Sequence, residues 1–191
     1  MSSLRVARWV PVTEAEGPGR RFALWLQGCS LACPGCCNAD LWDPAGGREV
    51  LAAAVAAALE AVRSEVEGIT LLGGEPFDQA AGAAEVARAA RGWGLSVAVF
   101  TGYSRPELES RGDEGTAALL AATDLLVDGR YDASRPERAR RWVGSANQRF
   151  HFLTGRYAPG LEILRPGEPA ETVELHLGAD GSVIRSGWPV E

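Results

Sequence analysis

Four short apolar runs, each followed by a loop rich in glycine, acid or cysteine, constrain the fold of this chain more than any other feature. The runs have the length of β-strands and lie at residues 21–27, 69–72, 95–100 and 124–127. Stretches of helical composition lie between them, at residues 48–66, 78–93 and 106–122. Strands and helices that alternate in this way predict a parallel sheet, with the functional loops at the carboxyl ends of its strands.

The two ends of the chain differ from this pattern. Residues 4–12 predict a short strand followed by a turn. Six of the nineteen arginines fall within residues 130–149, which we interpret as a helix-and-loop excursion before a strand at 150–153. Residues 159–169 are typical of a linker. The β-rich runs 172–177 and 182–185, on either side of a turn, predict a terminal hairpin.

These elements predict an α/β fold: an incomplete, open parallel (β/α) barrel, or partial TIM barrel, with a C-terminal β-hairpin extension. The 191 residues are fewer than the ~250 typical of a closed eightfold barrel, so we expect about five or six strand–helix units. We assign residues 1–158 to the partial barrel and residues 159–191 to a linker and hairpin extension of the same domain. The open side would admit a macromolecular substrate.

Composition excludes several classes of protein. The net charge is −6, with 25 acidic and 19 basic residues, which argues against a dedicated nucleic-acid binder. The longest uninterrupted apolar run, residues 50–59, is far shorter than the ~20 residues needed to cross a bilayer, so no membrane span is expected. The first residues lack the apolar region and cleavage site of a secretion signal, and we therefore expect a cytoplasmic protein.

All four cysteines lie between residues 29 and 37, which in a reducing compartment indicates metal or redox chemistry. The spacing C-x3-C-x2-C of Cys29, Cys33 and Cys36 supplies three thiolates, one fewer than a closed zinc or iron–sulfur site requires. A 4Fe-4S cluster held by three cysteines keeps one iron open to a substrate. Three alternatives stay open, namely Cys37 replacing Cys36 as a ligand, a structural zinc site, and a redox pair of Cys33 and Cys36.

Further motifs follow the cysteines in a fixed order along the chain. They are Gly73-Gly74-Glu75-Pro76 with Gln79, Thr101-Gly102-Tyr103, Asp128-Gly129-Arg130, and Gly144-Ser145-x-Asn147-Gln148-Arg149. Together with the cysteine loop and Gly17-Pro18-Gly19-Arg20, they resemble the radical S-adenosylmethionine superfamily. The resemblance is strongest to its small branch that activates glycyl radical enzymes such as anaerobic ribonucleotide reductase, and it covers residues 17 to 150.

The resemblance implies a set of cofactor contacts. Cys29, Cys33 and Cys36 would hold the 4Fe-4S cluster and so form the catalytic centre, and the open iron would bind the amino and carboxylate groups of S-adenosyl-L-methionine. The loop Gly73-Gly74-Glu75 would receive the methionyl amino group, because a carboxylate suits an ammonium. The other implied contacts, to the adenine, the ribose or the methionyl group, are Gly35, Cys37, Thr101, Asp128, Ser145 and Asn147.

The resemblance also implies an activity. A reduced cluster would cleave S-adenosylmethionine to methionine and a 5'-deoxyadenosyl radical, which would abstract hydrogen from a glycine of a partner glycyl radical enzyme. A flavodoxin- or ferredoxin-type protein would donate the electron. The alternatives are a stand-alone enzyme of the same chemistry that modifies a small molecule or peptide, and a non-enzymatic zinc or iron–sulfur protein.

Two features depart from the family pattern. Cys37 stands where an aromatic residue usually follows the third cluster cysteine. The segment beyond Tyr157 is longer than a minimal activating protein requires, and could shape a different substrate entrance.

Overall fold

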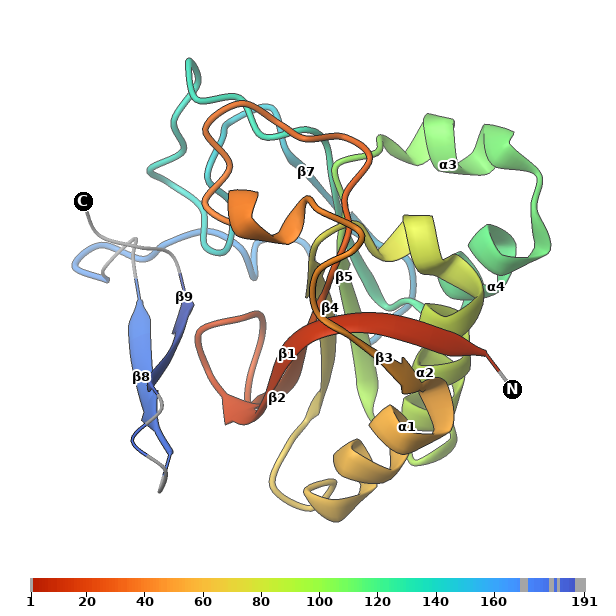
Figure 1. Ribbon diagram of the computed structural model, residues 1–191. Coiled ribbons are helices and arrows are strands. Elements are labelled where there is room, and N and C mark those ends of the chain that lie inside the picture. The colour runs from red at the N-terminus through yellow and green to blue at the C-terminus, as the bar shows by residue number, and fades with distance from the viewer. Residues whose placement is uncertain (1, 169–171, 179–180, 182, 188–191) are drawn as a thin grey trace.

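A computed structural model describes residues 2–168, 172–178, 181 and 183–187 (Figure 1). Its centre is a seven-stranded sheet of order β3-β1-β2-β4-β5-β6-β7, and a two-stranded sheet, β8-β9, lies beside it. The strands of the large sheet are β1 (Ser3–Thr13), β2 (Arg21–Leu26), β3 (Arg48–Leu51), β4 (Gly68–Gly73), β5 (Ser96–Phe100), β6 (Leu125–Asp128) and β7 (Arg149–Phe152). The hairpin consists of β8 (Val173–Leu177) and β9 (Val183–Gly187).

The predicted α/β class is confirmed, and the large sheet is mixed. Strands β2, β4, β5 and β6 are parallel neighbours. The outer strands β1, β3 and β7 run antiparallel to their neighbours. The described residues therefore contain three parallel crossovers rather than five or six strand–helix units, because β7 returns antiparallel to β6 without an intervening helix. The partial-barrel geometry stays a prediction.

Helices cover one face of the large sheet (Figure 1). They are α1 (Ala52–Ala61), α2 (Ala80–Gly92), α3 (Arg105–Arg111) and α4 (Glu114–Ala122), with short 3-10 turns η1 (Ala39–Leu41) and η2 (Pro76–Gln79). Alternate residues of each parallel strand, such as Phe22 and Leu24, pack under the helices in the main core. The intervening residues, such as Ala23 and Trp25, face the other side, where smaller clusters form.

Three of the predicted helical segments differ in the structure. Residues 48–51 form edge strand β3, because β1 offers them a backbone ladder, and helix α1 ends at Ala61, well before Gly68. The segment 106–122 contains two helices, because Gly112 adopts φ +68° at the end of α3 and Asp113 caps α4. The described residues 130–148 contain no helix; Arg140 instead donates to the carbonyls of Ala146 and Gln148 and stabilises an irregular loop.

Arg21 closes the amino-terminal end of the face opposite the helices. Its side chain is fully buried and donates to the hydroxyl oxygens of Ser96 at 2.6 Å, Tyr157 at 3.0 Å and Thr70 at 3.1 Å, and to the carbonyl of Ile69. Burial lowers the pKa of this guanidinium. The group therefore joins three strands and the segment after β7 through a polar network.

The predicted C-terminal hairpin is confirmed for the described residues; its turn positions 179, 180 and 182 lie outside them. The hairpin attaches to the end of β1 and the following turn through polar contacts. The hydroxyl of Thr13 donates to Oε2 of Glu174 at 2.5 Å, and the backbone N–H of Glu14 donates to Oε1 of Glu174 at 2.9 Å. The buried Ser186 hydroxyl lies 3.2 Å from the hydroxyl of Thr13.

No helix within the described part of the chain has the length and apolar character that a bilayer crossing demands.

Replacing Arg21 with alanine should strongly destabilise the fold. The substitution leaves a cavity and removes the partner of several buried oxygen atoms, which together cost about 3 kcal/mol. For a chain of this size we expect the melting temperature to fall by about 10 °C. Thermal unfolding followed by tryptophan fluorescence measures this, with Arg20→Ala as the control because Arg20 is exposed. Equal melting temperatures for the two variants would contradict the structural role of Arg21.

Candidate active site

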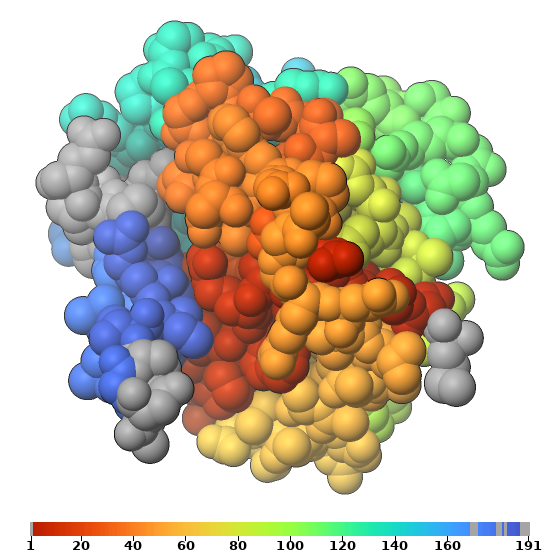
Figure 2. All heavy atoms as spheres, viewed as in Figure 1, coloured from red at the N-terminus to blue at the C-terminus, as the bar shows by residue number. Residues whose placement is uncertain are grey.

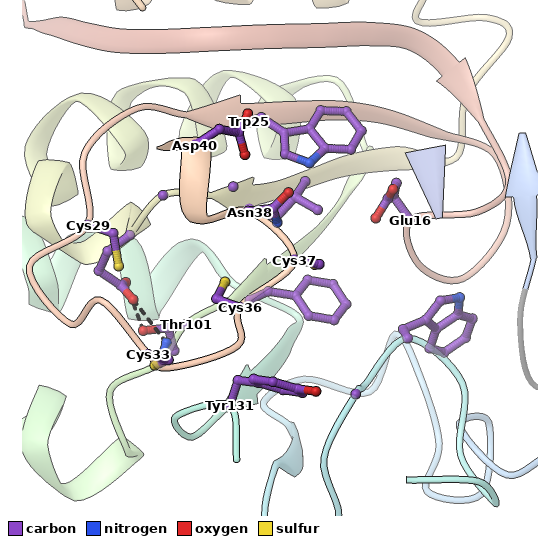
Figure 3. Close-up of a pocket in the computed structure, with 18 of the residues that line it drawn as sticks. Glu16, Trp25, Cys29, Cys33, Cys36, Cys37, Asn38, Asp40, Thr101 and Tyr131 are labelled. Carbon is purple, nitrogen blue, oxygen red and sulfur yellow. Dashed lines mark hydrogen bonds between the residues drawn. The ribbon is translucent and has the colours of Figure 1, made fainter. Parts of the chain in front are cut away.

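A cavity of about 470 Å³ opens at the carboxyl ends of the parallel strands (Figure 3). The cysteine loop forms one side of it, and the loops after β4, β5 and β6 contribute Gly74, Thr101 and Gly129. The hairpin contributes Ile184 and Arg185. Because parallel strands deliver their following loops to one edge, segments far apart in the sequence meet here.

The cysteine loop leaves β2 directly and is held closed by backbone hydrogen bonds. Gly28, with φ +94°, donates to the carbonyl of Leu41 at 2.8 Å, and Cys29 donates to that of Trp42 at 3.1 Å. The turn from Cys33 to Cys36 is closed by a 3.1 Å backbone bond between them. All four thiols are free and all four cysteines line the cavity. The predicted trio Cys29, Cys33 and Cys36 is therefore brought together on one wall, with Cys37 beside it.

Side chains from two other loops fix the segment between Cys29 and Cys33. Ser30 donates its backbone N–H to Asp78 at 2.8 Å, and its hydroxyl lies 2.7 Å from that of Tyr103. The hydroxyl of Tyr103 donates to Asp78 at 2.9 Å, and the guanidinium of Arg111 stacks 4.3 Å from the centre of the Tyr103 ring. Tyr103 and Asp78 thus couple the cysteine loop to the loops after β5 and β4.

The thiols differ in their ease of ionisation. A hydrogen bond from the Cys37 thiol, opposed by burial, lowers the pKa of Cys36 to about 6 and raises that of Cys37. Burial raises the pKa of Cys29. The lowered pKa favours the thiolate form of Cys36, which is the form that binds iron. Among the described residues, no three His, Cys, Asp or Glu side chains converge closely enough to hold a single metal ion.

Gly73 and Gly74 line the cavity, and packing alone already requires them to be glycine. A Cβ on Gly74 would lie 2.2 Å from the carbonyl oxygen of Gly28, in the cysteine loop. Gly73 has φ +100°, and a Cβ there would lie 2.8 Å from the Cα of Trp25. These glycines allow the loop after β4 to lie against the cysteine loop. From the sequence we expected these glycines to allow close approach of a ligand, and we did not predict their contact with the cysteine loop and β2.

The Glu75 carboxylate is almost completely buried and joins two loops of the cavity. One oxygen accepts from the N–H of Phe77 at 2.9 Å and from the hydroxyl of Thr101 at 2.8 Å. The other accepts from the N–H of Gly102 at 2.9 Å. Burial raises the pKa of Glu75 to about 7 in spite of these donors. Glu75 and Thr101, both predicted cofactor contacts, are therefore bonded to each other on the cavity wall.

Four other predicted contacts do not line the cavity but hold the loops around it. Asp128 accepts from the N–H of Arg105 at 2.6 Å and lies 3.0 Å from Nε2 of His151. Ser145 accepts from the N–H of Asp132 at 3.1 Å, and Asn147 donates to the carbonyl of Arg130 at 2.7 Å. The remaining one is Gly35, which has φ +78° in the cysteine turn, near the ring of Tyr131.

Several cavity residues were not predicted from the sequence. They include Arg8, Glu16, Trp25, Asp40, Phe100, Tyr131 and Trp142. Trp25 and Phe100 could have been found, because alternation along the strands 21–27 and 95–100 places them on the face away from the helices. Arg8 and Glu16 reach the cavity only because β1 pairs antiparallel with β2, and no local pattern indicates that pairing.

The pH dependence of the free energy of unfolding should reveal the raised pKa of the buried Glu75 carboxyl group. Its pKa is about 7 rather than 4.5, so the folded chain keeps a proton that the unfolded chain has released. The stability that this proton provides is complete below pH 4.5 and is lost as the pH rises to 7. Since glutamine does not titrate, the stability of Glu75→Gln relative to the wild type should rise by about 3 kcal/mol across that window.

Urea unfolding of the reduced apoprotein at a series of pH values measures this difference. Glu65→Gln, at an exposed position, is the control and should follow the wild-type curve at every pH. Parallel curves for Glu75→Gln and the wild type would show that the carboxyl of Glu75 titrates normally.

Comparison with known proteins finds a family that the chain matches and several similar relatives. Residues 15–151 match the family described as a 4Fe-4S single cluster domain. The chain is 30% identical over 154 residues to the anaerobic ribonucleoside-triphosphate reductase-activating protein of Vibrio cholerae, 32% over 160 residues to that of Salmonella typhimurium, and 31% over 156 residues to that of Escherichia coli K12.

These alignments include 76–78% of the present chain and 97–99% of the relatives. The family match ends at residue 151, before β8 and β9. The hairpin, which contributes to the cavity, is thus outside the matched part of the chain. The cysteine loop, the glycine loop after β4 and the loops after β5 and β6 are all inside it. The chain is a member of the family of anaerobic ribonucleoside-triphosphate reductase-activating proteins and carries their 4Fe-4S single cluster domain.

Proposed function

We propose that this protein is a radical S-adenosylmethionine enzyme that generates a glycyl radical on an anaerobic ribonucleoside-triphosphate reductase. The observation that carries the proposal is the presence of three cysteines, from one closed loop, on the wall of one cavity at the carboxyl edge of the sheet. Three ligands suit a cluster with one open iron, and the names of the relatives support the reductase as the partner.

The chemistry comes from the cofactors and the protein directs it. A reduced 4Fe-4S cluster and S-adenosylmethionine, when bound, would supply this chemistry: one-electron cleavage of the bond between sulfur and C5' to methionine and a 5'-deoxyadenosyl radical, which would abstract a hydrogen atom from glycine. Cys29, Cys33 and Cys36 would hold the cluster. Aromatic residues of the cavity, including Trp25 and Phe100, would limit the access of water to the radical.

We assign the remaining contacts to S-adenosylmethionine to the loops around the cavity. Three hydrogen bonds leave the Glu75 carboxylate about one acceptor position, which we assign to the methionyl ammonium beside Gly73 and Gly74. Thr101 is next to it. We assign the adenine to the region of Gly35 and Cys37.

Three assigned residues stand next to cavity residues in the sequence, and we propose that they position the ribose side of the site. These pairs are Asp128 with Gly129, Ser145 with Gly144, and Asn147 with Gln148. A flavodoxin or ferredoxin is the proposed electron donor. We place the reaction in the cytoplasm, where four free thiols stay reduced.

A second candidate is a stand-alone radical S-adenosylmethionine enzyme that modifies a small molecule or peptide. The observation in its favour is the hairpin, which lies outside the family match and borders the cavity. A glycyl radical detected on the reductase distinguishes the two functions, because only the activating enzyme produces it.

Alanine variants of the cysteines test the proposed ligands. Cys29→Ala, Cys33→Ala and Cys36→Ala should lose the cluster after anaerobic reconstitution and form no 5'-deoxyadenosine, because each removes one of three ligands. Cys37→Ala is the matched control and should keep the cluster, because Cys37 is not one of the three proposed ligands. Iron and sulfide content, with chromatography of the nucleoside after dithionite reduction, measures the result.

Two outcomes would contradict the proposal. Loss of iron from Cys37→Ala together with its retention by Cys36→Ala would assign the third ligand to Cys37. A wild-type protein that binds zinc, takes up no iron and forms no 5'-deoxyadenosine would favour a structural metal site.

A further inference from the structure

One end of the cavity is not used by the cofactor contacts described above. It lies between β1, β2 and the hairpin, and we call it the hairpin subsite. Its residues are Arg8, Glu16, Trp25, Ile184, Arg185 and Gly187. Figure 2 shows the hairpin, in blue, against the red N-terminal segment that carries the first two of these residues.

Arg8 presents a hydrogen-bond donor in this subsite without a partner. Its guanidinium carbon lies 4.9 Å from the centre of the Trp25 ring, and the two residues are opposite each other on β1 and β2. The Nε atom is buried, and none of the described residues accepts its hydrogen. Because a buried donor without an acceptor is costly, this atom calls for an oxygen from a bound molecule.

The hairpin wall of the subsite is firmly attached to the rest of the protein. The N–H of Gly187 donates to the carboxylate of Glu16, and Ile184 packs on the cluster that contains Trp25 and Leu72. The Ser186 hydroxyl lies close to the hydroxyl of Thr13 on β1. The hairpin therefore forms a fixed wall of the subsite, in which Ile184 packs against the cluster of Trp25 and charged groups lie around it.

We propose that the hairpin subsite binds an extended peptide segment of the protein substrate, with Arg8 donating to one of its backbone carbonyl oxygens. This inference rests on the proposed function, in which a glycine of a protein must enter the same cavity. An extended backbone offers alternating carbonyl and N–H groups, which match the donors Arg8 and Arg185 and the acceptor Glu16. The hairpin that completes the subsite lies beyond the family match.

The test uses the reconstituted protein with S-adenosylmethionine and a fluorescein-labelled synthetic peptide that spans the radical-forming glycine of the reductase from the same organism. Fluorescence anisotropy gives the dissociation constant without turnover. Arg8→Gln should weaken peptide binding about tenfold, the loss expected for one hydrogen bond from a charged donor. Its iron content and its formation of 5'-deoxyadenosine without the reductase should match the wild type.

Arg48→Gln is the matched control. Arg48 also stacks on a tryptophan, 4.5 Å from the centre of the Trp9 ring, but it lies outside the cavity on exposed β3. This variant should bind the peptide like the wild type. If Arg8→Gln does not fold, Arg8→Lys keeps a positive charge near Trp25 but lacks Nε, and it should also bind the peptide more weakly.

The outcomes separate the two proposals. Unchanged peptide affinity in a folded Arg8 variant, or no binding of the peptide by the wild type, overturns the subsite. If the wild type binds the peptide in an Arg8-dependent way but forms no 5'-deoxyadenosine, the subsite is supported and the proposed radical chemistry fails. If Arg8→Gln and Arg48→Gln weaken peptide binding equally, the effect comes from the loss of positive charge on the protein as a whole. That result would also overturn the subsite.

Discussion

The buried carboxylate of Glu75 is the interaction on which the site depends, because it joins loops that follow different strands. It accepts hydrogen bonds from its own 3-10 turn and from the loop after β5. The backbone N–H of the same residue donates to the carbonyl of Gly28 in the cysteine loop at 2.8 Å. One residue thus fixes three loops at the carboxyl edge of the sheet. The energetic cost of this burial is visible in its raised pKa.

The amino-terminal end of the sheet face that lies away from the helices is filled, and the cavity lies at the other end. Arg21 fills the amino-terminal end through hydrogen bonds to three hydroxyl groups, and the fully buried Ala23 and Ala98 pack in clusters on the same face. The cavity lies at the other end, at the carboxyl ends of the strands. On the far side of the sheet, large side chains such as Phe22 and Leu71 pack under the helices. Alternation along each strand produces both the core and the wall of the cavity.

Much of this site could be predicted because its signals are local. The spacing of Cys29, Cys33 and Cys36 lies within eight consecutive residues, and the Gly73-Gly74-Glu75 segment directly follows an apolar strand. Other signals misled local reasoning. Residues 48–51 have helical composition but complete a ladder with β1, and Arg140 donates to loop carbonyls in a segment that forms no helix. In both cases a tertiary partner outweighed the propensity of the segment.

The sequence by itself determined the thiol set, the strand–loop order and the parallel centre of the sheet, because each depends on neighbouring residues. The tertiary structure decided that Glu75 and Thr101 bond to each other, and that Gly74 is needed for contact with the cysteine loop. It also decided that Arg8 and the hairpin border the same cavity. These relations join residues separated by 26 to about 180 positions, and they form only when strand pairing brings distant segments together, which no local periodicity encodes.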